Sequence, residues 1–504
     1  MRMEPKMKNI FAKISLTLLV PLCLVSCLEK TPSDKLLTDE GMETLNGADQ
    51  LCNGVYTKLM SGALYSGYLT LCPDIQSDLV YAVQGNSNTY GNIWMWDIRS
   101  TTSEIGSVYA ALYSVIGSCN YFLDGVDDLR ARLSDDEEIQ YLDHLHGEVL
   151  CARALAYSEL AKCFCKAYNA ENASGLGLVL SDSFVNEAPK KRASLEETYR
   201  FIIADLEKAC ELFSSYSDQA NAPYFSYGAA QALWARVCLY MEDWDGAIEH
   251  SSYLLDSGVY ALADANALYT SGKTYLQYMW TNDASYEVIF KIGYTSTSYG
   301  SPIGQVFLNF NRDFTYYYPD FVPATWVLNL YNSADLRYDA YFTELQTGYS
   351  HALVWPLLTK YMGNEGLMSN YIYHVCMPKP LRLAEQYLIR SEAYCRKGQF
   401  SKANADINAL RQKRYSTGGT VSMNEDSWLD IISDERVREL FMEGFRLQDL
   451  KRWGRGFERT PQTSCQSEGS SMKVTADDPL FVWPIPRNEI EATGSEIEGN
   501  ESNR

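Results

Sequence analysis

The chain has 504 residues, of which 46% are hydrophobic and 21% are charged, so it can bury a sizeable core. Its 64 acidic and 43 basic residues give a formal net charge of −21. This charge disfavours nucleic acid and anionic membrane surfaces as partners.

The first 26 residues have the organisation of a secretory signal peptide. Basic residues precede an uncharged, mostly apolar run over residues 14–26, which is too short to cross a bilayer. Residues 24–27 (LVSC) are similar to a bacterial lipobox, which implies cleavage before Cys27 and lipidation of that cysteine. We therefore expect residues 1–26 to be removed and residues 27–40 to form a flexible tether held on a membrane by acyl chains. An ordinary cysteine beside a plain cleavage site is the alternative.

Two segments have the spacing of tetratricopeptide helix pairs. A small residue, an aromatic residue and a second small residue recur at the same intervals in both segments. The small residues let two helices approach closely, and the aromatic residue closes the turn between them. The two sets are Ala235, Trp244 and Ala247, and then Ser391, Phe400 and Ala403.

Further helices are predicted by apolar periodicity. A degenerate third pair would join a helix that includes residues 147–157 to a helix over residues 198–213, and single helices are expected over residues 104–129 and 430–453. Because the two clear pairs lie far apart in the chain, we do not expect a continuous solenoid. The predicted fold class is mostly α, a scaffold of helix pairs with long irregular loop insertions and a few short strands.

Two loop segments are rich in aromatic residues. Helical periodicity is lost between residues 258 and 323, where only a short strand over residues 286–292 is expected. An earlier loop, residues 81–102, carries Trp94 and Trp96 among Asn and Asp residues. Sugars are bound by flat rings flanked by polar groups, so both loops are candidate sugar sites. The two tryptophans would share one face if the segment were extended, and packing onto the helices is the alternative.

The cysteines and charged pairs favour structural roles. Eleven of the thirteen cysteines lie beyond Cys27, without Cys-x-x-Cys spacing, and we expect them to be buried thiols rather than a disulfide framework. Glu435 with Arg438 and Asp449 with Arg452 stand at helix-pairing intervals, which predicts salt bridges within a helix. His144 and His146 lack a metal-binding spacing. Neither a metal nor a cofactor is therefore predicted.

Three segments of the C-terminal third carry a family resemblance. They are residues 378–394 (PKPLRLAEQYLIRSEAY), residues 431–453 (IISDERVRELFMEGFRLQDLKRW) and residues 481–486 (FVWPIP). The first contains an Arg-x-x-Glu motif, the second contains Glu-Gly-x-Arg, and the third contains Pro-x-Pro. Together with the lipobox, these segments resemble the SusD/RagB family of nutrient-uptake outer-membrane lipoproteins.

The resemblance implies a function, a partner and a site. It implies a surface-exposed outer-membrane protein that captures oligosaccharides without altering them, as a lid on a SusC-like TonB-dependent barrel. It divides the chain into a helical region 41–257, a loop-rich insertion 258–345 and a C-terminal RagB/SusD domain 346–504. Carried over by region, the ligand-binding residues are Asp74, Asp78, Trp94, Trp96, Tyr299, Tyr316, Tyr317 and Trp326.

Two other functions stay open at this point. The RagB-type branch of the family resembles peptide importers, so the ligand could be a peptide. A surface glycoside hydrolase needs only two suitably spaced carboxylates, and 64 acidic residues do not exclude one.

Overall fold

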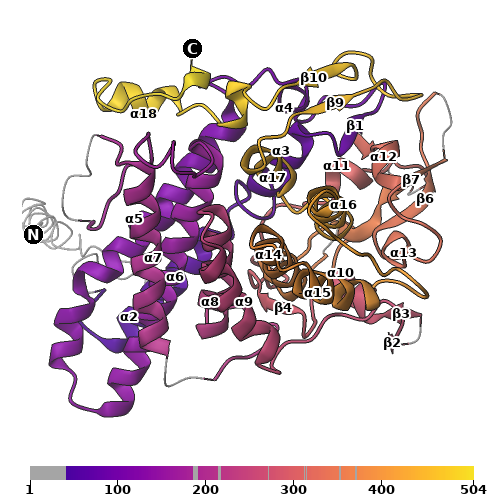
Figure 1. Ribbon diagram of the computed structural model, residues 1–504. Coiled ribbons are helices and arrows are strands. Elements are labelled where there is room, and N and C mark those ends of the chain that lie inside the picture. The colour runs from indigo at the N-terminus through magenta and orange to yellow at the C-terminus, as the bar shows by residue number, and fades with distance from the viewer. Residues whose placement is uncertain are drawn as a thin grey trace, which may run out of the picture.

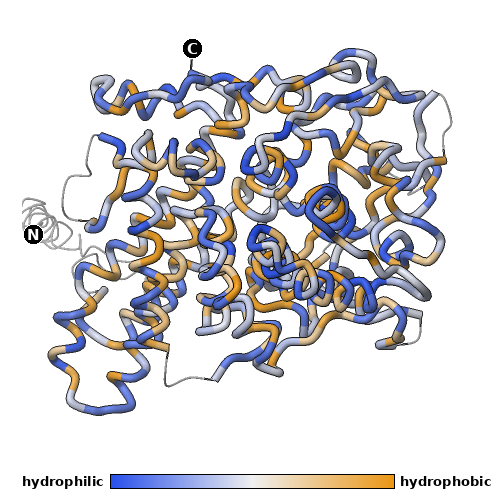
Figure 2. Tube along the Cα trace, in the orientation of Figure 1, coloured by the Kyte–Doolittle hydropathy of each residue, from blue (hydrophilic) through white to orange (hydrophobic). Residues whose placement is uncertain are grey.

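The computed structural model describes residues 41–503, apart from residues 185–190, 214–216, 271, 312, 314, 351–353 and 369–371. The predicted signal peptide, Cys27 and the predicted tether lie outside the described residues. The molecule is mostly helical with short two-stranded sheets, as predicted (Figure 1). Within the described part, no helix combines the length and the apolarity needed to span a bilayer. In Figure 2, hydrophilic and hydrophobic positions are interspersed along the helices.

Most helices of the N-terminal half form a packed layer on the left of Figure 1, while α3 and α4 lie nearer its centre. The predicted helices over residues 104–129 and 198–213 are observed as α5 and α7. α7 begins with a capping box between Ser194 and Glu197, which satisfies free N–H groups of its first turn. The helices of this half are α2 (Leu45–Leu59), α3 (Tyr68–Gln76), α4 (Gly91–Trp94), α5 (Ser103–Arg132), α6 (Asp136–Phe164), α7 (Leu195–Leu212), α8 (Tyr227–Tyr240) and α9 (Trp244–Asp256).

The predicted helix pairs are confirmed as α6–α7, α8–α9 and α14–α15, where α14 is Leu383–Arg396 and α15 is Phe400–Gln412. In space they form one stack, because α7 packs on α8 and α9 packs on α14, but the insertion interrupts this stack along the chain, so it is not a continuous solenoid. Ala235 and Ala247 share a buried cluster with Ile389 and Ala393, across this second contact. The chain between the second and third pairs therefore leaves the stack and returns to it.

Short strands connect segments that are distant in the chain. Strand β1 (Val80–Ala82) pairs with β5 (Phe321–Pro323), and β4 (Val288–Phe290) pairs with β8 (Leu381–Arg382). The predicted strand over residues 286–292 is thus observed as β4. Each pairing joins two of the three regions predicted from the sequence. The boundaries of those regions remain a prediction. The other pairs are β2 (Leu268–Thr270) with β3 (Lys273–Thr274), β6 (Phe342–Gln346) with β7 (Val354–Leu358), and β9 (Phe457–Arg459) with β10 (Met472–Val474).

The helix predicted over residues 430–453 is interrupted. α16 (Trp428–Leu440) and α17 (Arg446–Arg452) are separated by a turn in which Gly444 has a φ of +85°. A Cβ on Gly444 would lie 3.1 Å from the backbone of Thr70, so the turn requires glycine. The prediction of one continuous helix is wrong because a contact with a distant segment fixes this turn.

The insertion and the C-terminus complete the described structure with short elements. These are α10 (Tyr275–Asn282), α11 (Gln305–Leu308), α12 (Thr325–Leu328), α13 (Arg337–Tyr341), α18 (Arg487–Ala492) and three 3₁₀ turns at Thr359–Tyr361, Pro479–Phe481 and Glu501–Asn503.

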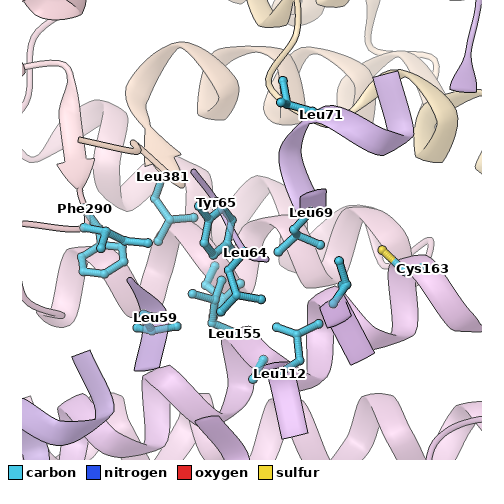
Figure 3. Close-up of a cluster of buried hydrophobic side chains, with 14 of the residues drawn as sticks. Leu59, Leu64, Tyr65, Leu69, Leu71, Leu112, Leu155, Cys163, Phe290 and Leu381 are labelled. Carbon is cyan, nitrogen blue, oxygen red and sulfur yellow. The ribbon is translucent and has the colours of Figure 1, made fainter. Parts of the chain in front are cut away.

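One large hydrophobic core joins all three predicted regions. In Figure 3, Leu59, Leu64 and Leu155 from the helical layer lie close to Phe290 of the insertion and Leu381 from the start of the C-terminal helix pair. All of these side chains are buried. The insertion is therefore fixed to the helical scaffold by shared apolar burial. The eleven described cysteines are free thiols, nine of them buried, in agreement with the prediction.

Candidate functional site

A surface hollow of about 610 Å³ lies where α12, β7 and the segment after β9 meet. Its volume is in the range of small-molecule sites, about 300–1,000 Å³. The lining residues are Asp78, Tyr81, Thr325, Trp326, Trp355, Glu458, Thr460, Pro461, Gln462 and Thr463.

Three aromatic rings line the hollow, and each is held in place. Trp326 donates its indole N–H to the carbonyl of Asp78 at 2.8 Å, and its side chain stays half-buried. Tyr81 donates to the carbonyl of Thr460 at 2.8 Å and accepts from the N–H of the same residue at 2.9 Å. Trp355, also half-buried, is carried by β7 opposite Leu345. The hydrogen bonds fix the rings of Trp326 and Tyr81, and the strand pairing fixes the backbone that carries Trp355.

One residue that lines the hollow, Asp78, forms an ion pair with a residue behind it, Arg446. The guanidinium of Arg446 donates to both carboxylate oxygens of Asp78 at 2.9 Å, and it lies 5.4 Å from the ring centroid of Trp326. Below it, the Asp74 carboxylate accepts from the backbone N–H groups of Gly444 and Arg446, both at 2.9 Å. Burial raises the pKa of Asp74 to about 7, although these two donors oppose the shift.

The predicted site residues separate into three groups. Asp78 and Trp326 line the hollow together, and their part in binding stays a prediction. Tyr299, Tyr316 and Tyr317 are half-buried or exposed, and they do not line this hollow. Asp74, Trp94 and Trp96 lie in or against the interior.

The expectation that Trp94 and Asp74 contact a ligand is wrong, because both side chains are fully buried. The tryptophan segment is not extended: α4 ends at Trp94, and Trp96 has a φ of +60°. Trp94 donates to the carbonyl of Val80 at 3.1 Å. Its ring lies under the guanidinium of Arg459, 4.9 Å from the centroid.

Trp96 is a packing residue with a half-buried ring. It contacts Phe457 and Phe481 with centroid distances of 5.6 and 5.5 Å, and its indole N–H donates to the carbonyl of Gln76 at 2.6 Å. Arg459 supports the same region, since its guanidinium donates to the carbonyls of Gln76 and Ser77 at the end of α3. Trp96 therefore packs against β9 and the end of α3, next to residues that line the hollow.

Sequence reasoning missed most of the residues that line the hollow. Tyr81 lay within the loop singled out from the sequence, but its ring was not selected. Trp355, Glu458 and Gln462 come from segments that gave no binding signal. They meet the N-terminal loop only through long-range pairings such as Val83 with Cys465. No local pattern in the sequence encodes that meeting.

The family motifs build a buried ionic network. The Glu439 carboxylate of α16 contacts Arg382 at 2.8 Å and Arg414 at 2.9 Å, and Arg337 contacts it at 3.0 Å. Arg382, from the Arg-x-x-Glu motif, also donates to Glu443 of the Glu-Gly-x-Arg motif at 2.8 Å. The predicted pairs Glu435–Arg438 and Asp449–Arg452 are confirmed at 2.8 and 2.9 Å. The motifs thus fasten α14, α16 and the insertion to each other.

The segment that contains His144 and His146 also has a structural role. His144 pairs with Glu148 at 3.0 Å, and burial lowers the pKa of His146 to about 4. Among the described residues, no group of three or more His, Cys, Asp or Glu side chains is arranged to hold a metal ion.

Two family models match the chain. One, described as starch-binding and associating with outer membrane, matches residues 28–239. The other, described as the SusD family, matches residues 338–500 and so includes all three motif segments up to residue 486.

Two curated relatives are similar in sequence. The starch-binding protein SusD of Bacteroides thetaiotaomicron is 41% identical over 110 residues, which are 22% of this chain and 18% of that protein. A SusD-like protein of Formosa agariphila is 24% identical over 381 residues, 65% of this chain and 71% of that protein. The first alignment thus spans less than a fifth of that relative.

Solved structures share the fold over nearly the whole chain. A SusD superfamily protein from Bacteroides thetaiotaomicron has a TM-score of 0.78 at 22% identity, covering 91% of this chain and 99% of the other. A putative sugar binding protein from Bacteroides vulgatus has a TM-score of 0.75 at 24% identity, covering 92% and 100%. At these identities the likeness establishes the fold. The motifs, the matched family models and the shared fold agree that this chain belongs to the SusD/RagB family.

Proposed function

We propose that this protein binds oligosaccharides in the hollow around Trp326 and Trp355 and does not alter them. The observation that carries the proposal is the pairing of fixed aromatic rings with hydroxyl and amide groups in one cavity of about 610 Å³. Sugar rings present C–H faces to aromatic rings and hydroxyls to polar side chains. One matched family is described as starch-binding, and one solved protein of the same fold is a putative sugar binding protein. Both support a glycan as the ligand.

The chemistry of the hollow favours binding over hydrolysis. A glycosidase needs two carboxylates, one of them able to donate a proton. Of the two carboxylates that line the hollow, Asp78 already accepts two hydrogen bonds from Arg446 and is engaged in that ion pair. Glu458 is exposed to solvent, unlike the enclosed carboxyl group that acts as the acid in such enzymes. The hydrolase alternative is therefore less well supported.

The place and partner of the protein form the second part of the proposal. A lipid-anchored protein on the outer-membrane surface would pass its ligand to a SusC-like TonB-dependent barrel. Support comes from the lipobox before Cys27 and from the family description, which mentions the outer membrane. The test is co-purification of a barrel protein with the chain from detergent-extracted outer membranes, compared with a Cys27→Ser variant.

Calorimetry tests the binding proposal. The protein is titrated with gluco-, xylo-, manno- and fructo-oligosaccharides of about seven units and with a mixture of peptides. We expect at least one oligosaccharide to bind, and Trp355→Ala and Trp326→Ala to weaken it tenfold or more. Peptide binding without glycan binding would favour the peptide-importing alternative. Release of shorter sugars by the pure protein would contradict a role in binding alone.

A further inference from the structure

A cluster of three tyrosines lies on the surface, away from the hollow. Tyr269 of β2 contacts Tyr275 and Tyr278 of α10, with ring centroids 5.2 and 4.0 Å apart. Tyr269 is 47% exposed and Tyr275 is 40% exposed, while Leu268 beside them is 67% exposed. In Figure 1 the β2–β3 hairpin lies at the lower right edge, well separated from α12 at the upper right. We call Tyr269, Tyr275 and Tyr278 the tyrosine platform.

The tyrosine platform is not explained by folding. The opposite face of α10 anchors the helix, since Leu276, Met279 and Trp280 are buried in the main core. Among the described residues, none of the buried clusters or the side chains packed on them includes a ring of the platform. Tyr269 thus contacts the other two rings at the surface, and the apolar surface that these rings expose adds nothing to the core.

The exposed area of the tyrosine platform suits a small ligand rather than a protein. A tyrosine side chain buries about 150–250 Å² when it is fully covered. Two rings that are nearly half exposed and a third that is mostly buried therefore offer roughly 200 Å². A stable interface between two proteins needs about 800 Å² from each partner. The platform is therefore too small for a second copy of this chain and suits a ligand as wide as one or two sugar rings.

The hairpin and the helix that carry the tyrosine platform also carry polar groups. The Lys273 ammonium donates to the hydroxyl of Thr281 at 3.1 Å and to the side-chain carbonyl of Asn282 at 3.4 Å. An ammonium has three N–H groups, so a third is left for a sugar hydroxyl. Thr274 and Gln277 form a capping box at the start of α10, which fixes the helix that carries two of the three rings.

We propose that the tyrosine platform is a second glycan contact, which stacks on a sugar ring of a long chain whose other part occupies the hollow. The inference rests on the proposed function, because it takes the ligand to be a glycan. Two linked contacts raise the affinity for a polymer far above that for a short oligosaccharide, which reaches only one of them. The platform would thus hold one part of a long polysaccharide while another part occupies the hollow.

The experiment compares short and long ligands. Affinity gels containing amylopectin, xylan, mannan or inulin measure polymer retention, and calorimetry with the matching tetrasaccharides measures binding in the hollow. For the Tyr269→Ala/Tyr278→Ala double variant, we expect polymer retention to fall at least tenfold while the tetrasaccharide Kd changes less than twofold. Tyr269→Phe, which keeps the ring, should retain the polymer like the unchanged protein.

Controls separate this inference from the proposed function. Tyr286→Ala removes another tyrosine of the insertion, 69% exposed, and should change neither measurement. Trp355→Ala should weaken both. If the double variant has normal thermal stability and retains the polymer normally, the tyrosine platform is not a glycan contact, although the hollow still is. If the unchanged protein binds neither tetrasaccharides nor polymers, both proposals are wrong.

Discussion

Arg446 and Asp78 form an ion pair with two hydrogen bonds, each of 2.9 Å, directly beneath the Trp326 ring. The two residues belong to segments at opposite ends of the chain, and the side chain of each is about one-tenth exposed. The pair therefore fastens the C-terminal Glu-Gly-x-Arg motif to the segment after α3. It also fixes the position of the Asp78 carboxylate, which lines the hollow.

Breaking this ion pair should destabilise the protein. In Asp78→Asn, the Arg446 guanidinium keeps its charge in a nearly buried position and loses its counterion. Removing one partner of a buried ion pair lowers the free energy of unfolding by about 3–5 kcal/mol. Because this pair is partly exposed, we expect a loss near the lower end of that range. Urea denaturation measures the change. An Asp78→Asn/Arg446→Met double variant should cost less than the sum of the two single variants.

Trp94 and Trp355 should respond differently to truncation. Trp94→Ala opens a cavity in the core, and such changes cost about 3–5 kcal/mol. Trp355 is only half-buried, so Trp355→Ala should cost clearly less free energy of unfolding but weaken oligosaccharide binding. Thermal melts and calorimetry on both variants test the contrast. A stable Trp94→Ala variant with lost binding would contradict the assignment of Trp94 to the core.

Gly444→Ala should cost more stability than Gly454→Ala. Both glycines have positive φ, +85° and +62°. A Cβ at Gly444 would lie 3.1 Å from the Thr70 backbone, whereas a Cβ at Gly454 would meet nothing within 4 Å. The conformational cost of about 1–2 kcal/mol is shared, so the difference reports the steric contact. We expect a difference of at least about 1 kcal/mol in urea denaturation, and equal losses would contradict the close approach.

Acid should weaken the protein through Glu392. Burial opposes its charge, but the Arg452 guanidinium, donating at 2.5 and 2.7 Å, outweighs burial and lowers the pKa of Glu392 to about 2. The Glu392 carboxylate takes up a proton near pH 4.5 in the unfolded chain but only near pH 2 in the folded protein. The ionised Glu392 therefore stabilises the folded protein fully above pH 4.5, and this contribution is lost as the pH falls toward 2. The full contribution to the free energy of unfolding is about 3 kcal/mol.

The measurement is the free energy of unfolding between pH 7 and pH 2.5 for the protein and for Glu392→Gln. The difference between the two should shrink as the pH falls below 4.5. Glu425→Gln, which changes an exposed carboxylate, is the control and should show no such trend. A constant difference for Glu392→Gln across this range would contradict the depressed pKa.

Local spacing predicted the helix pairs, because helix formation and close packing depend on residues three to four positions apart. The pairs at Ala235 and Ser391 were therefore found. Their stacking was not, since the contact of α9 with α14 joins residues that are far apart in the chain. The continuous helix expected over residues 430–453 failed for the same reason, because Asp74 and Thr70 fix the turn at Gly444.

The sequence by itself determined the helical scaffold, the buried thiols and the family motifs, all of which depend on residue type at short spacing. Only the tertiary structure decided which aromatic rings face outward. Trp94 and Trp326 have the same side chain and similar loop surroundings in the sequence, yet one is covered by Arg459 and the other lines the hollow. The cover comes from β9, more than 350 residues along the chain, and burial depends on such distant neighbours.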